Sequence, residues 1–366
     1  SIEYRQNIPF KSVYFTGMVR DKQRRKMSKS LGNSPDPIQL METYGADGVR
    51  MGMLLSSPAG NDLMFDEALC EQGRNFNNKI WNALRLVQGW TKDERLPVPE
   101  ASRLAGIWMN ERLNQVINEI EDDFTKYRLS EALMRIYKCI WDDFCSIYLE
   151  VIKPAYQQPI DGITYAVSGE IFGKLMQVLH PFMPFITEEI WHILYGETRG
   201  DIMVSSMPVA ETLNKEMLSV FDFTLEIAEQ VRRVRSEKNI PQKNALELCV
   251  LYHDEETFYP EVIMKLCNVS AIHSIREKVE KSITFVAHKH EFFIPFSENI
   301  NVEEEITKLK EEITYTQGFL NSVTKKLSNQ QFVNNAPAQV VEIERKKQAD
   351  AEEKLHLLEE KLKMLK

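Results

Sequence analysis

The sequence predicts a mainly α-helical protein whose first part is the end of a Rossmann-like α/β domain. Three observations lead to this fold class. A strand-like segment, a basic loop and a short helix follow one another in residues 11–44. From residue 66 to residue 191, apolar side chains recur at the spacing of amphipathic helices. Beyond residue 302 the chain becomes rich in Glu, Lys, Leu and Gln and carries two apolar seams.

Length sets the domain organisation. A chain of 366 residues is too long for one ordinary core. We expect four parts: the end of an α/β domain, a helical bundle, a small α+β unit and an antiparallel coiled-coil hairpin, at residues 1–62, 63–212, 213–300 and 301–366. Since the chain opens on Ser1 and runs at once into strand-like sequence, we expect it to be a piece of a longer protein.

Composition predicts a cytoplasmic protein without membrane contact. Charged residues make up 27% of the chain, as in ordinary globular proteins. No apolar run approaches the roughly 18 residues that a membrane span needs. The five cysteines form no C-x-x-C pair, which argues against a zinc knuckle or a disulfide framework and for free thiols in a reducing compartment. We therefore expect no protein-bound metal.

The first part is predicted to contain a strand, a ligand-binding loop and a helix. Residues 11–17 (KSVYFTG) have the composition of a buried strand that ends at glycine. Asp36 is the expected N-cap, with Pro37 at the first position of a helix that ends before Gly45. In α/β sheets, ligands bind beyond the carboxyl ends of the strands. The loop between strand and helix is therefore the expected ligand site.

This loop reverses the sign of the chain's charge locally. It holds six basic residues and one acid between Arg20 and Lys29, in a protein with net charge −9. Its pentapeptide, Lys26-Met27-Ser28-Lys29-Ser30, suits a polyphosphate, because ammonium groups supply charge and hydroxyls supply directed hydrogen bonds. Gly32 and Asn33 allow the backbone to turn closely behind it. The alternative is a solvated basic loop.

Four long amphipathic helices are predicted next, and a bundle is the economical way to bury their apolar sides. Pro181 and Pro184 should end the last of them, before a short helix through Ile186. The apolar positions that predict the long helices are Phe76, Ile80, Leu84, Val87, Leu113, Val116, Ile117, Ile120, Leu133, Ile136, Ile140, Phe144, Ile147, Tyr148, Leu175, Val178 and Leu179.

The last third of the chain is predicted to hold a small α+β unit and a helical hairpin. A helix at about residues 215–237 should lead into the small unit, which has strands at 246–252, 283–287 and 292–296 and a helix at 259–266. The apolar seams on either side of Asn334-Asn335-Ala336-Pro337 predict an antiparallel hairpin that projects from the body. An oligomerisation zipper is the alternative reading of these seams.

From the pentapeptide onward, the chain resembles the valyl-tRNA synthetases, which are class I aminoacyl-tRNA synthetases. The run Tyr44-Gly45-Ala46-Asp47 with Arg50 is shared by the Val, Ile, Leu and Met enzymes, whereas residues 74–83 (RNFNNKIWNA) are closest to the valine enzyme. Residues 141–150 and 180–191 resemble the family's anticodon-binding bundle. The hairpin, with Phe332, Asn335-Ala336-Pro337 and Val340-Val341, resembles its tRNA-binding arm.

The resemblance implies an ATP-dependent ligase that forms valyl-adenylate and charges tRNA-Val, with Mg²⁺ accompanying ATP. It assigns catalytic roles to Lys29 and Lys26. ATP binding is assigned to the whole pentapeptide, which also contains Met27, Ser28 and Ser30. We expect Met27 and Leu31 to anchor the loop by packing. The family's first signature, His-x-Gly-His, does not occur in these residues. Its valine pocket and editing domain precede the pentapeptide, so we expect the chain alone to be inactive and mainly to supply the loop and tRNA binding.

Three groups of residues are predicted to bind tRNA. For two of these groups there is an alternative. The polar residues of the helix after residue 66 could form a solvated face, and those of the helix near residue 235 could form a salt-bridged surface. The expected residues are Arg74, Asn75, Asn78, Lys79, Asn82 and Arg85 on the first helix, Arg232 and Arg235 among the outward basic residues of the second, and Lys325, Lys326, Arg345, Lys346 and Lys347 near the hairpin turn. Trp81, Trp141, Phe144 and Cys145 should be packed, and His288 and His290 should be surface histidines.

Other functions remain open from the sequence alone. One is another class I synthetase of the isoleucyl or leucyl type, and the second is a non-catalytic RNA-binding module. The expected partners are tRNA-Val, together with ATP and valine in the full-length enzyme, and we expect a monomer.

Overall fold

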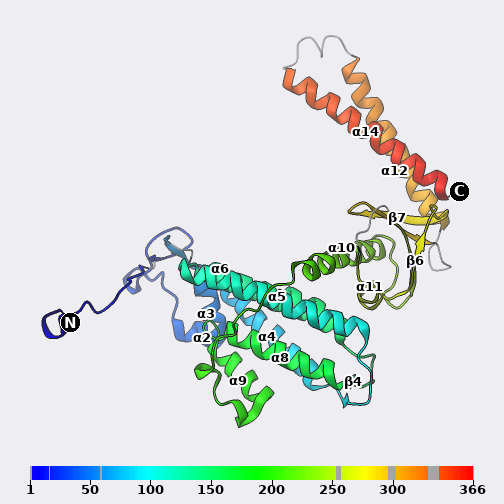
Figure 1. Ribbon diagram of the computed structural model, residues 1–366. Helices are drawn as coiled ribbons and strands as arrows, with labels where there is room; N and C mark the ends of the chain where they lie inside the picture. Colours follow the sequence, from blue (N-terminus) through cyan, green and yellow to red (C-terminus); the bar gives the residue numbers. More distant parts are fainter. Residues whose placement is uncertain are drawn as a thin grey trace. The chain divides into compact units, whose positions relative to one another are not determined.

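The computed structural model describes residues 2–15, 17–57, 60–252, 257–295, 302–328 and 338–365. The chain forms two compact units, Ser1–Phe221 and Asp222–Lys366. Most of the described residues are helical (Figure 1). Among them, no helix is both long and apolar enough to cross a lipid bilayer.

The first unit begins with α1 (Ile2–Arg5) and an exposed segment. The prediction of a buried strand at residues 11–17 is wrong for the residues that the structure describes there, 11–15 and 17. None of them belongs to a strand, and Phe15 is 83% exposed. A strand requires a hydrogen-bonded neighbour, and the pairing here is made instead by β1 (Val19–Arg20) with β2 (Leu63–Met64), which run parallel.

The elements after β1 follow the prediction. A 3₁₀ turn, η1 (Lys29–Leu31), precedes α2 (Pro37–Tyr44). The Asp36 side chain accepts a hydrogen bond from the N–H of Ile38 (2.9 Å), and Gly45 ends the helix with φ at 75°. The predicted N-cap, first residue and end of this helix are therefore confirmed, and α3 (Ala46–Leu55) follows directly.

Long helices fill the rest of the first unit. Figure 1 shows three of them, α4 (Glu67–Gln88), α5 (Glu100–Thr125) and α8 (Gly162–Leu179), and α8 packs against both α4 and α5. All the apolar positions that predicted helices are buried except Ile147, which is half-buried. The remaining elements are β3 (Lys92–Asp93), α6 (Leu129–Lys138), the π-helix η2 (Cys139–Tyr148), α7 (Leu149–Ile152), β4 (Ile160–Asp161), α9 (Pro184–Tyr195), η3 (Gly196–Arg199) and η4 (Ile202–Val204).

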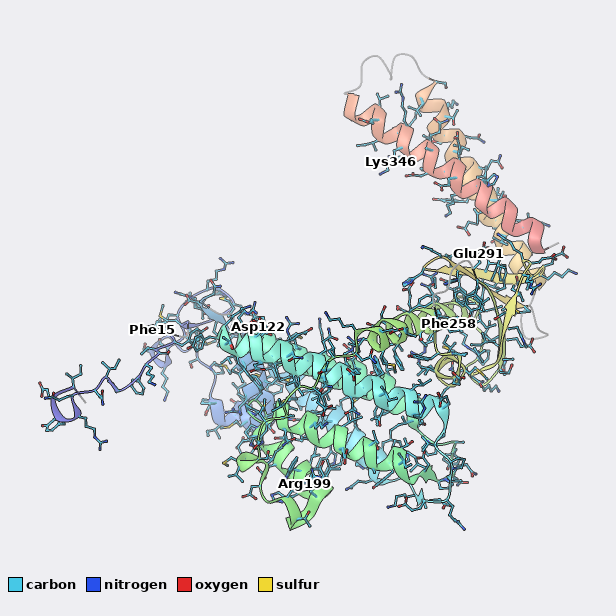
Figure 2. The ribbon with its side chains drawn as sticks, in the orientation of Figure 1. Phe15, Asp122, Arg199, Phe258, Glu291 and Lys346 are labelled. Atoms are coloured by element: carbon cyan, nitrogen blue, oxygen red, sulfur yellow. The ribbon has the colours of Figure 1, made fainter. Side chains whose placement is uncertain are left out.

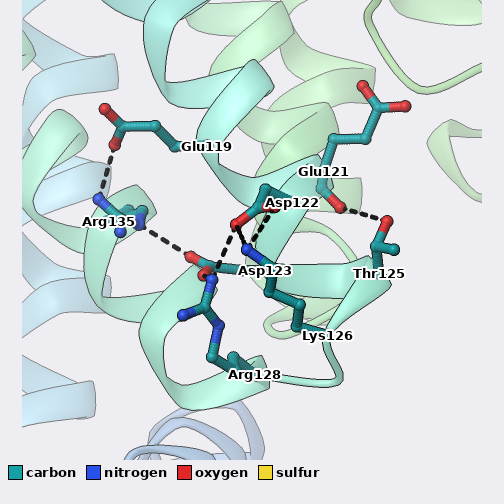
Figure 3. Close-up of polar contacts among 8 residues, drawn as sticks. All are labelled: Glu119, Glu121, Asp122, Asp123, Thr125, Lys126, Arg128 and Arg135. Carbon is teal, nitrogen blue, oxygen red and sulfur yellow. Dashed lines mark hydrogen bonds and ion pairs between the residues drawn. The ribbon is translucent and has the colours of Figure 1, made fainter.

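An ion network fixes the corner between α5 and α6 (Figure 3). The fully buried carboxylate of Asp123 accepts a hydrogen bond from Arg135 and forms an ion pair with Arg128, both at 2.8 Å. Arg135 also pairs with Glu119 (2.7 Å), one helical turn earlier on α5. Because a buried charge is costly unless it is paired, these contacts specify the sharp reversal at Tyr127, whose φ is 58°.

The second unit contains most of α10 (Lys215–Glu237) and a four-stranded sheet in the order β6-β5-β8-β7. Strands β5 (Leu246–Leu251), β7 (Ser282–Ala287) and β8 (His290–Pro295) and helix α11 (Pro260–Cys267) lie close to their predicted positions. The sequence reading missed β6 (Val269–Ile275), which pairs parallel to β5 at the sheet edge. Edge strands show weak apolar alternation, and only Val269 of this strand is buried.

Two helices end the chain, α12 (Val302–Leu327) and α14 (Ala338–Leu365). They pack against each other and run in opposite directions (Figure 1). Val323, Val341 and Leu358 are buried between them, and Lys354 pairs with Glu312 across the interface at 2.8 Å. The predicted turn residues Asn334 to Pro337, and Phe332 before them, lie outside the described residues.

Candidate functional site

The basic loop that contains the pentapeptide Lys26–Ser30, which we call the signature loop, is a short backbone hairpin between β1 and η1. The N–H of Met27 donates to the carbonyl of Val19, and the N–H of Asp21 donates to the carbonyl of Arg25, both at 3.0 Å. Met27 packs against the small core around Leu40 and Phe65, which confirms its predicted anchoring role. Leu31 does not share this role, because it lies on the outer side of η1 and is 66% exposed.

Asp21 and Asn33 join the two ends of this loop. The amide Nδ2 of Asn33 donates to Asp21 Oδ2 (3.0 Å) and to the carbonyl of Lys26 (3.2 Å), and its Oδ1 accepts from the N–H of Ser28 (2.9 Å). Asp21 also accepts from the backbone and the guanidinium of Arg25, at 2.9 and 2.8 Å. The bond from Asn33, followed by those from Arg25, holds the pKa of Asp21 well below its usual range. Sequence reasoning treated Asn33 only as a turn residue and missed this network.

Local acids neutralise half of the loop's basic residues. Arg20 pairs with Asp62, Lys22 with Asp66 (3.2 Å) and Arg25 with Asp21 (2.7 Å). In the part of the chain that the structure describes, the other three have no ion-pair partner; they are Arg24, Lys26 and Lys29. The positive charge available to a ligand is therefore concentrated on and beside the two signature lysines.

Helix α4 separates an apolar side from a polar stripe, as predicted. Phe76, Ile80 and Leu84 are buried. The exposed members of the predicted set, which we call the α4 stripe, are Asn75, Asn78, Asn82 and Arg85. Because residues three, four and seven apart share a helix face, these side chains form one row along the helix.

Arg74 and Lys79 lie at the two edges of the α4 stripe and already have partners. Arg74 pairs with Glu71 (3.0 Å) and lies 5.6 Å from the ring centre of Tyr44. The ammonium of Lys79 lies 5.3 Å from the ring centre of Trp141. Trp81, expected to be packed, is 37% exposed because it follows Asn78 by one turn on the solvent side. Trp141 is half-buried, whereas Phe144 and Cys145 are buried as predicted.

Two residues of α3 attach this helix to the turn between α8 and α9. The buried carboxylate of Asp47 accepts hydrogen bonds from the N–H groups of Ile186 (2.7 Å) and Phe185 (3.3 Å), at the start of α9. Arg50 donates to the carbonyls of Pro181 (3.1 Å) and Phe182 (3.0 Å). Burial raises the pKa of Asp47, against the opposing effect of these hydrogen bonds. The shared Asp47–Arg50 pattern therefore has a structural role in joining α3 to this turn.

The prediction that Arg235 faces outward is wrong. Arg235 is only 4% exposed, and its guanidinium donates to the carbonyls of Cys267 (2.8 and 3.0 Å), Asn268 (3.0 Å) and Pro241 (3.1 Å). Burial lowers its pKa. The helical period brings Arg235 onto the side of Val231 and Val234, which the sequence reading had reserved for apolar residues. Arg232 is exposed.

The basic residues of the hairpin fall into two classes. Lys326 and Lys347 both pair with Glu344, at 3.8 and 2.8 Å. The hydrogen bond from Lys347, and then the charge of Lys326, lower the pKa of Glu344. Within the described parts of the hairpin, the exposed residues Lys325, Arg345 and Lys346 have no ion-pair partner; Figure 2 labels Lys346 on α14.

Histidine occurs in two groups of side chains that could be considered as metal sites, one at His288 and His290 and the other at His192. His288 is exposed and pairs with Glu226 (3.0 Å). His290 is fully buried against the rings of Phe223 on α10 and Tyr252, so its predicted surface position is wrong. Glu188, His192 and Asp201 offer ligand atoms within 4.8 Å of one another. The Glu188 oxygen in this group already accepts from the N–H of Ile202 (2.9 Å), and His192 and Asp201 are exposed, which is the arrangement of an ordinary surface ion pair.

Three family models match consecutive parts of the chain. Residues 1–66 match the class I tRNA synthetases of the I, L, M and V group. Residues 107–250 match the anticodon-binding domain of tRNA ligases, and residues 301–366 match the valyl-tRNA synthetase tRNA-binding arm.

Curated relatives align along nearly the whole chain. A "Valine--tRNA ligase" of Parabacteroides distasonis is 55% identical over 99% of this chain and 42% of its own length. That of Phocaeicola vulgatus is 52% identical over 100% of this chain and 42% of its own length. The chain thus spans less than half the length of these relatives.

A solved structure gives a much weaker likeness. The ternary complex of Agrobacterium radiobacter LeuRS with tRNA and LeuAMS is 21% identical over 57% of this chain and 25% of its own, with a TM-score of 0.42, and it supports no argument. The curated relatives and the matched family models together decide the assignment. The chain belongs to the valyl-tRNA synthetase family and corresponds to the C-terminal part of these enzymes.

Proposed function

We propose that this chain is the part of a valine–tRNA ligase that supplies the pyrophosphate-binding loop and holds tRNA-Val. The observation that carries the proposal is the identity of 50–55% to valine–tRNA ligases along essentially the whole chain. In the complete enzyme, valine would attack the α-phosphate of ATP to form valyl-adenylate and pyrophosphate, and the valyl group would then pass to the tRNA.

In this reaction Lys29 and Lys26 would stabilise the negative charge that builds on the leaving pyrophosphate. Preorganised ammonium groups lower such a barrier without a protein nucleophile. Ser28 and Ser30, whose hydroxyls lie 3.1 Å apart, would add directed hydrogen bonds, and Met27 would hold the loop from beneath. The exposure of both lysines supports this role. Mg²⁺ would arrive with ATP as part of the substrate.

The α4 stripe is the proposed site of anticodon contact. Single-stranded RNA loops expose base edges to hydrogen-bonding side chains and base faces to aromatic rings and guanidinium planes. Asn75, Asn78 and Asn82 would meet base edges, and Arg85 would contact phosphate or stack. Arg74 and Lys79 would join from the edges, since their present partners are exposed or half-exposed groups.

Other contacts would hold the rest of the tRNA. On the arm we propose Lys325, Lys326, Arg345, Lys346 and Lys347. The three that form no ion pair with the described residues, Lys325, Arg345 and Lys346, would contribute most. Arg232 remains a candidate for phosphate contact, whereas buried Arg235 is not one. We further propose that the enzyme acts as a cytoplasmic monomer, an assignment motivated by its cysteine spacing and by a hairpin seam that is satisfied within one chain.

A binding comparison tests the anticodon assignment. We expect Asn78→Ala combined with Asn82→Ala to weaken binding to tRNA-Val, by about 1–3 kcal/mol for each base-directed hydrogen bond that the substitutions remove. The loss should shrink for a tRNA-Val transcript with a changed anticodon. Asn118→Ala, which removes an exposed asparagine from α5, is the matched control. Equal losses for both transcripts would show that the stripe does not read the anticodon.

A further inference from the structure

The conformation of the signature loop depends on one amide side chain. Asn33 bonds to the carbonyl of Lys26 and to the N–H of Ser28, so it clamps the backbone on both sides of Met27. Met27 itself is held in the small core. With these three points fixed, the flanking side chains of Lys26 and Lys29 must project outward from the loop.

Asp21 determines which way this amide faces. Its carboxylate accepts from Asn33 Nδ2, which leaves Asn33 Oδ1 free to accept from Ser28. A flipped amide would bring Oδ1 against the carboxylate and an N–H against the N–H of Ser28, and both contacts would be repulsive. Asp21 is in turn held by the N–H groups of Gln23 (3.0 Å) and Arg25 (2.9 Å). The orientation of Asn33 is therefore specified jointly by Asp21, which lies outside the pentapeptide, and by the backbone of Lys26 and Ser28.

Such a clamp matters most where a charged ligand must be met by preformed groups. Ordering a flexible loop costs conformational entropy at the moment of binding, and a loop that is already ordered avoids that cost. The hydrogen bonds that Asn33 makes to Asp21, Lys26 and Ser28 tie together both ends of the loop and its middle. The side chains of Lys26 and Lys29 do not help to order the loop, because within the described residues they form no ion pair.

We propose that Asp21 and Asn33 are positioning residues, which hold Lys26 and Lys29 ready for a diphosphate-type anion before that anion binds. The inference rests on the proposed function for the identity of the ligand. The conformational part of it rests only on the hydrogen bonds of the loop. Neither residue touches the ligand in this proposal; both act through the backbone of the pentapeptide.

The pair can be separated by isosteric variants. Asn33→Asp keeps the acceptor for Ser28, loses both amide donors and adds a carboxylate beside Asp21. Asp21→Asn brings two amide groups face to face. In the double variant, the amide introduced at position 21 can again donate to the carboxylate introduced at position 33, so the pair is partly restored. Asn118→Asp on α5 adds the same charge at an exposed site away from the loop and serves as the control.

Limited trypsin digestion of the whole chain, with mass spectrometry of the first cleavage products, measures the fraction of molecules in which the loop is open. Cleavage of a native loop tracks its open population when opening is fast. We expect Asn33→Asp and Asp21→Asn each to raise cleavage after Lys26 and Lys29 roughly tenfold. The double variant should recover part of the protection, and Asn118→Asp should match the wild type. No increase in the single variants, or no recovery in the double variant, would overturn the proposal.

Pyrophosphate binding separates this inference from the proposed function. If the wild-type chain binds pyrophosphate in calorimetry, Asn33→Asp should weaken that binding by the factor by which the closed fraction of the loop falls, because only the closed loop is competent to bind. Affinity that stays unchanged in a variant whose closed fraction has fallen severalfold would overturn the positioning role. If the wild-type chain shows no binding, the ligand assignment of the loop fails, while the digestion experiment still decides whether Asp21 and Asn33 hold it closed.

Discussion

At the scale of single residues, burial decides which charged groups can meet a ligand. Arg232 and Arg235 lie on the same helix three positions apart, and only Arg232 is exposed. Arg235 saturates its guanidinium with backbone carbonyls from the end of α11 and the loop before β5. One side chain therefore remains a candidate for phosphate contact, and the other holds together the second unit.

This difference predicts opposite phenotypes. Arg235→Gln should destabilise the second unit by about 1–3 kcal/mol, because it leaves buried carbonyls without donors. Arg232→Gln should leave stability within about 0.5 kcal/mol, as is usual for exposed positions. Since all five tryptophans lie between residues 81 and 191, unfolding of the second unit has to be followed by circular dichroism rather than by tryptophan fluorescence. Equal stability of the two variants would contradict the assigned role of Arg235.

Asp47 offers a second prediction, on pH dependence. Asp47→Ala should destabilise the first unit by about 1–3 kcal/mol, since the N–H of Ile186 loses its acceptor. Asp47→Asn keeps one acceptor and should cost less. Because burial raises the pKa of Asp47, the folded state binds its proton more tightly than the unfolded state does. Wild-type stability should therefore improve relative to Asp47→Asn as the pH falls through this raised pKa toward the ordinary aspartate value. Tryptophan fluorescence in urea at several pH values measures both effects.

The two proposed RNA-contacting elements, helix α4 and the hairpin of α12 and α14, are oriented in different ways. Helix α4 places a polar row opposite a fully buried apolar row, so packing alone orients the α4 stripe. Within its described residues, the hairpin of α12 and α14 buries few apolar side chains between its helices, among them Val323, Val341 and Leu358. It is also held by cross-helix ion pairs, between Glu312 and Lys354 and between Glu344 and Lys326. These pairs fix which residues of the two helices lie opposite each other.

The Glu344 pair makes the hairpin sensitive to acid. Lys347 and Lys326 lower the pKa of Glu344, so its contribution is present above the ordinary glutamate pKa of about 4.3 and is lost as the pH falls through the lowered value. Glu344→Gln should therefore lower the thermal midpoint of the second unit at pH 7, measured by far-UV circular dichroism. Below that window the variant and the wild type should converge. A difference that persists in strong acid would show that the pair is not the cause.

At the scale of the whole molecule, periodic patterns were the most reliable guide. Amphipathic repeats placed the helices, and Asp36, Pro37 and Gly45 placed the ends of α2, because these signals are local. Residues 11–15 and β6 were misjudged because strand formation depends on a neighbour that the local sequence does not contain. The signature loop and the α4 stripe were recognisable from residue types. Their partners Asp62, Asp66 and Trp141 were not, since ion pairs and ring contacts form between segments far apart in the chain.

The salt dependence of binding between this chain and tRNA-Val, followed by fluorescence anisotropy, tests most directly whether the arm and the α4 stripe hold the tRNA. We compare the wild type with a triple variant, Lys325→Gln, Arg345→Gln and Lys346→Gln, and with a control that changes the Glu344-paired residues, Lys326→Gln and Lys347→Gln. Phosphate contacts release counterions, so the removal of each one should flatten the slope of log K against log salt by roughly 0.7–0.9.

We expect the wild-type chain to prefer tRNA-Val over tRNAs with other anticodons. The triple variant should bind more weakly with a flatter slope, and the control should change less. A chain that binds all tRNAs equally, with the same affinity and slope in the triple variant, would contradict the account that the α4 stripe and the arm hold tRNA-Val.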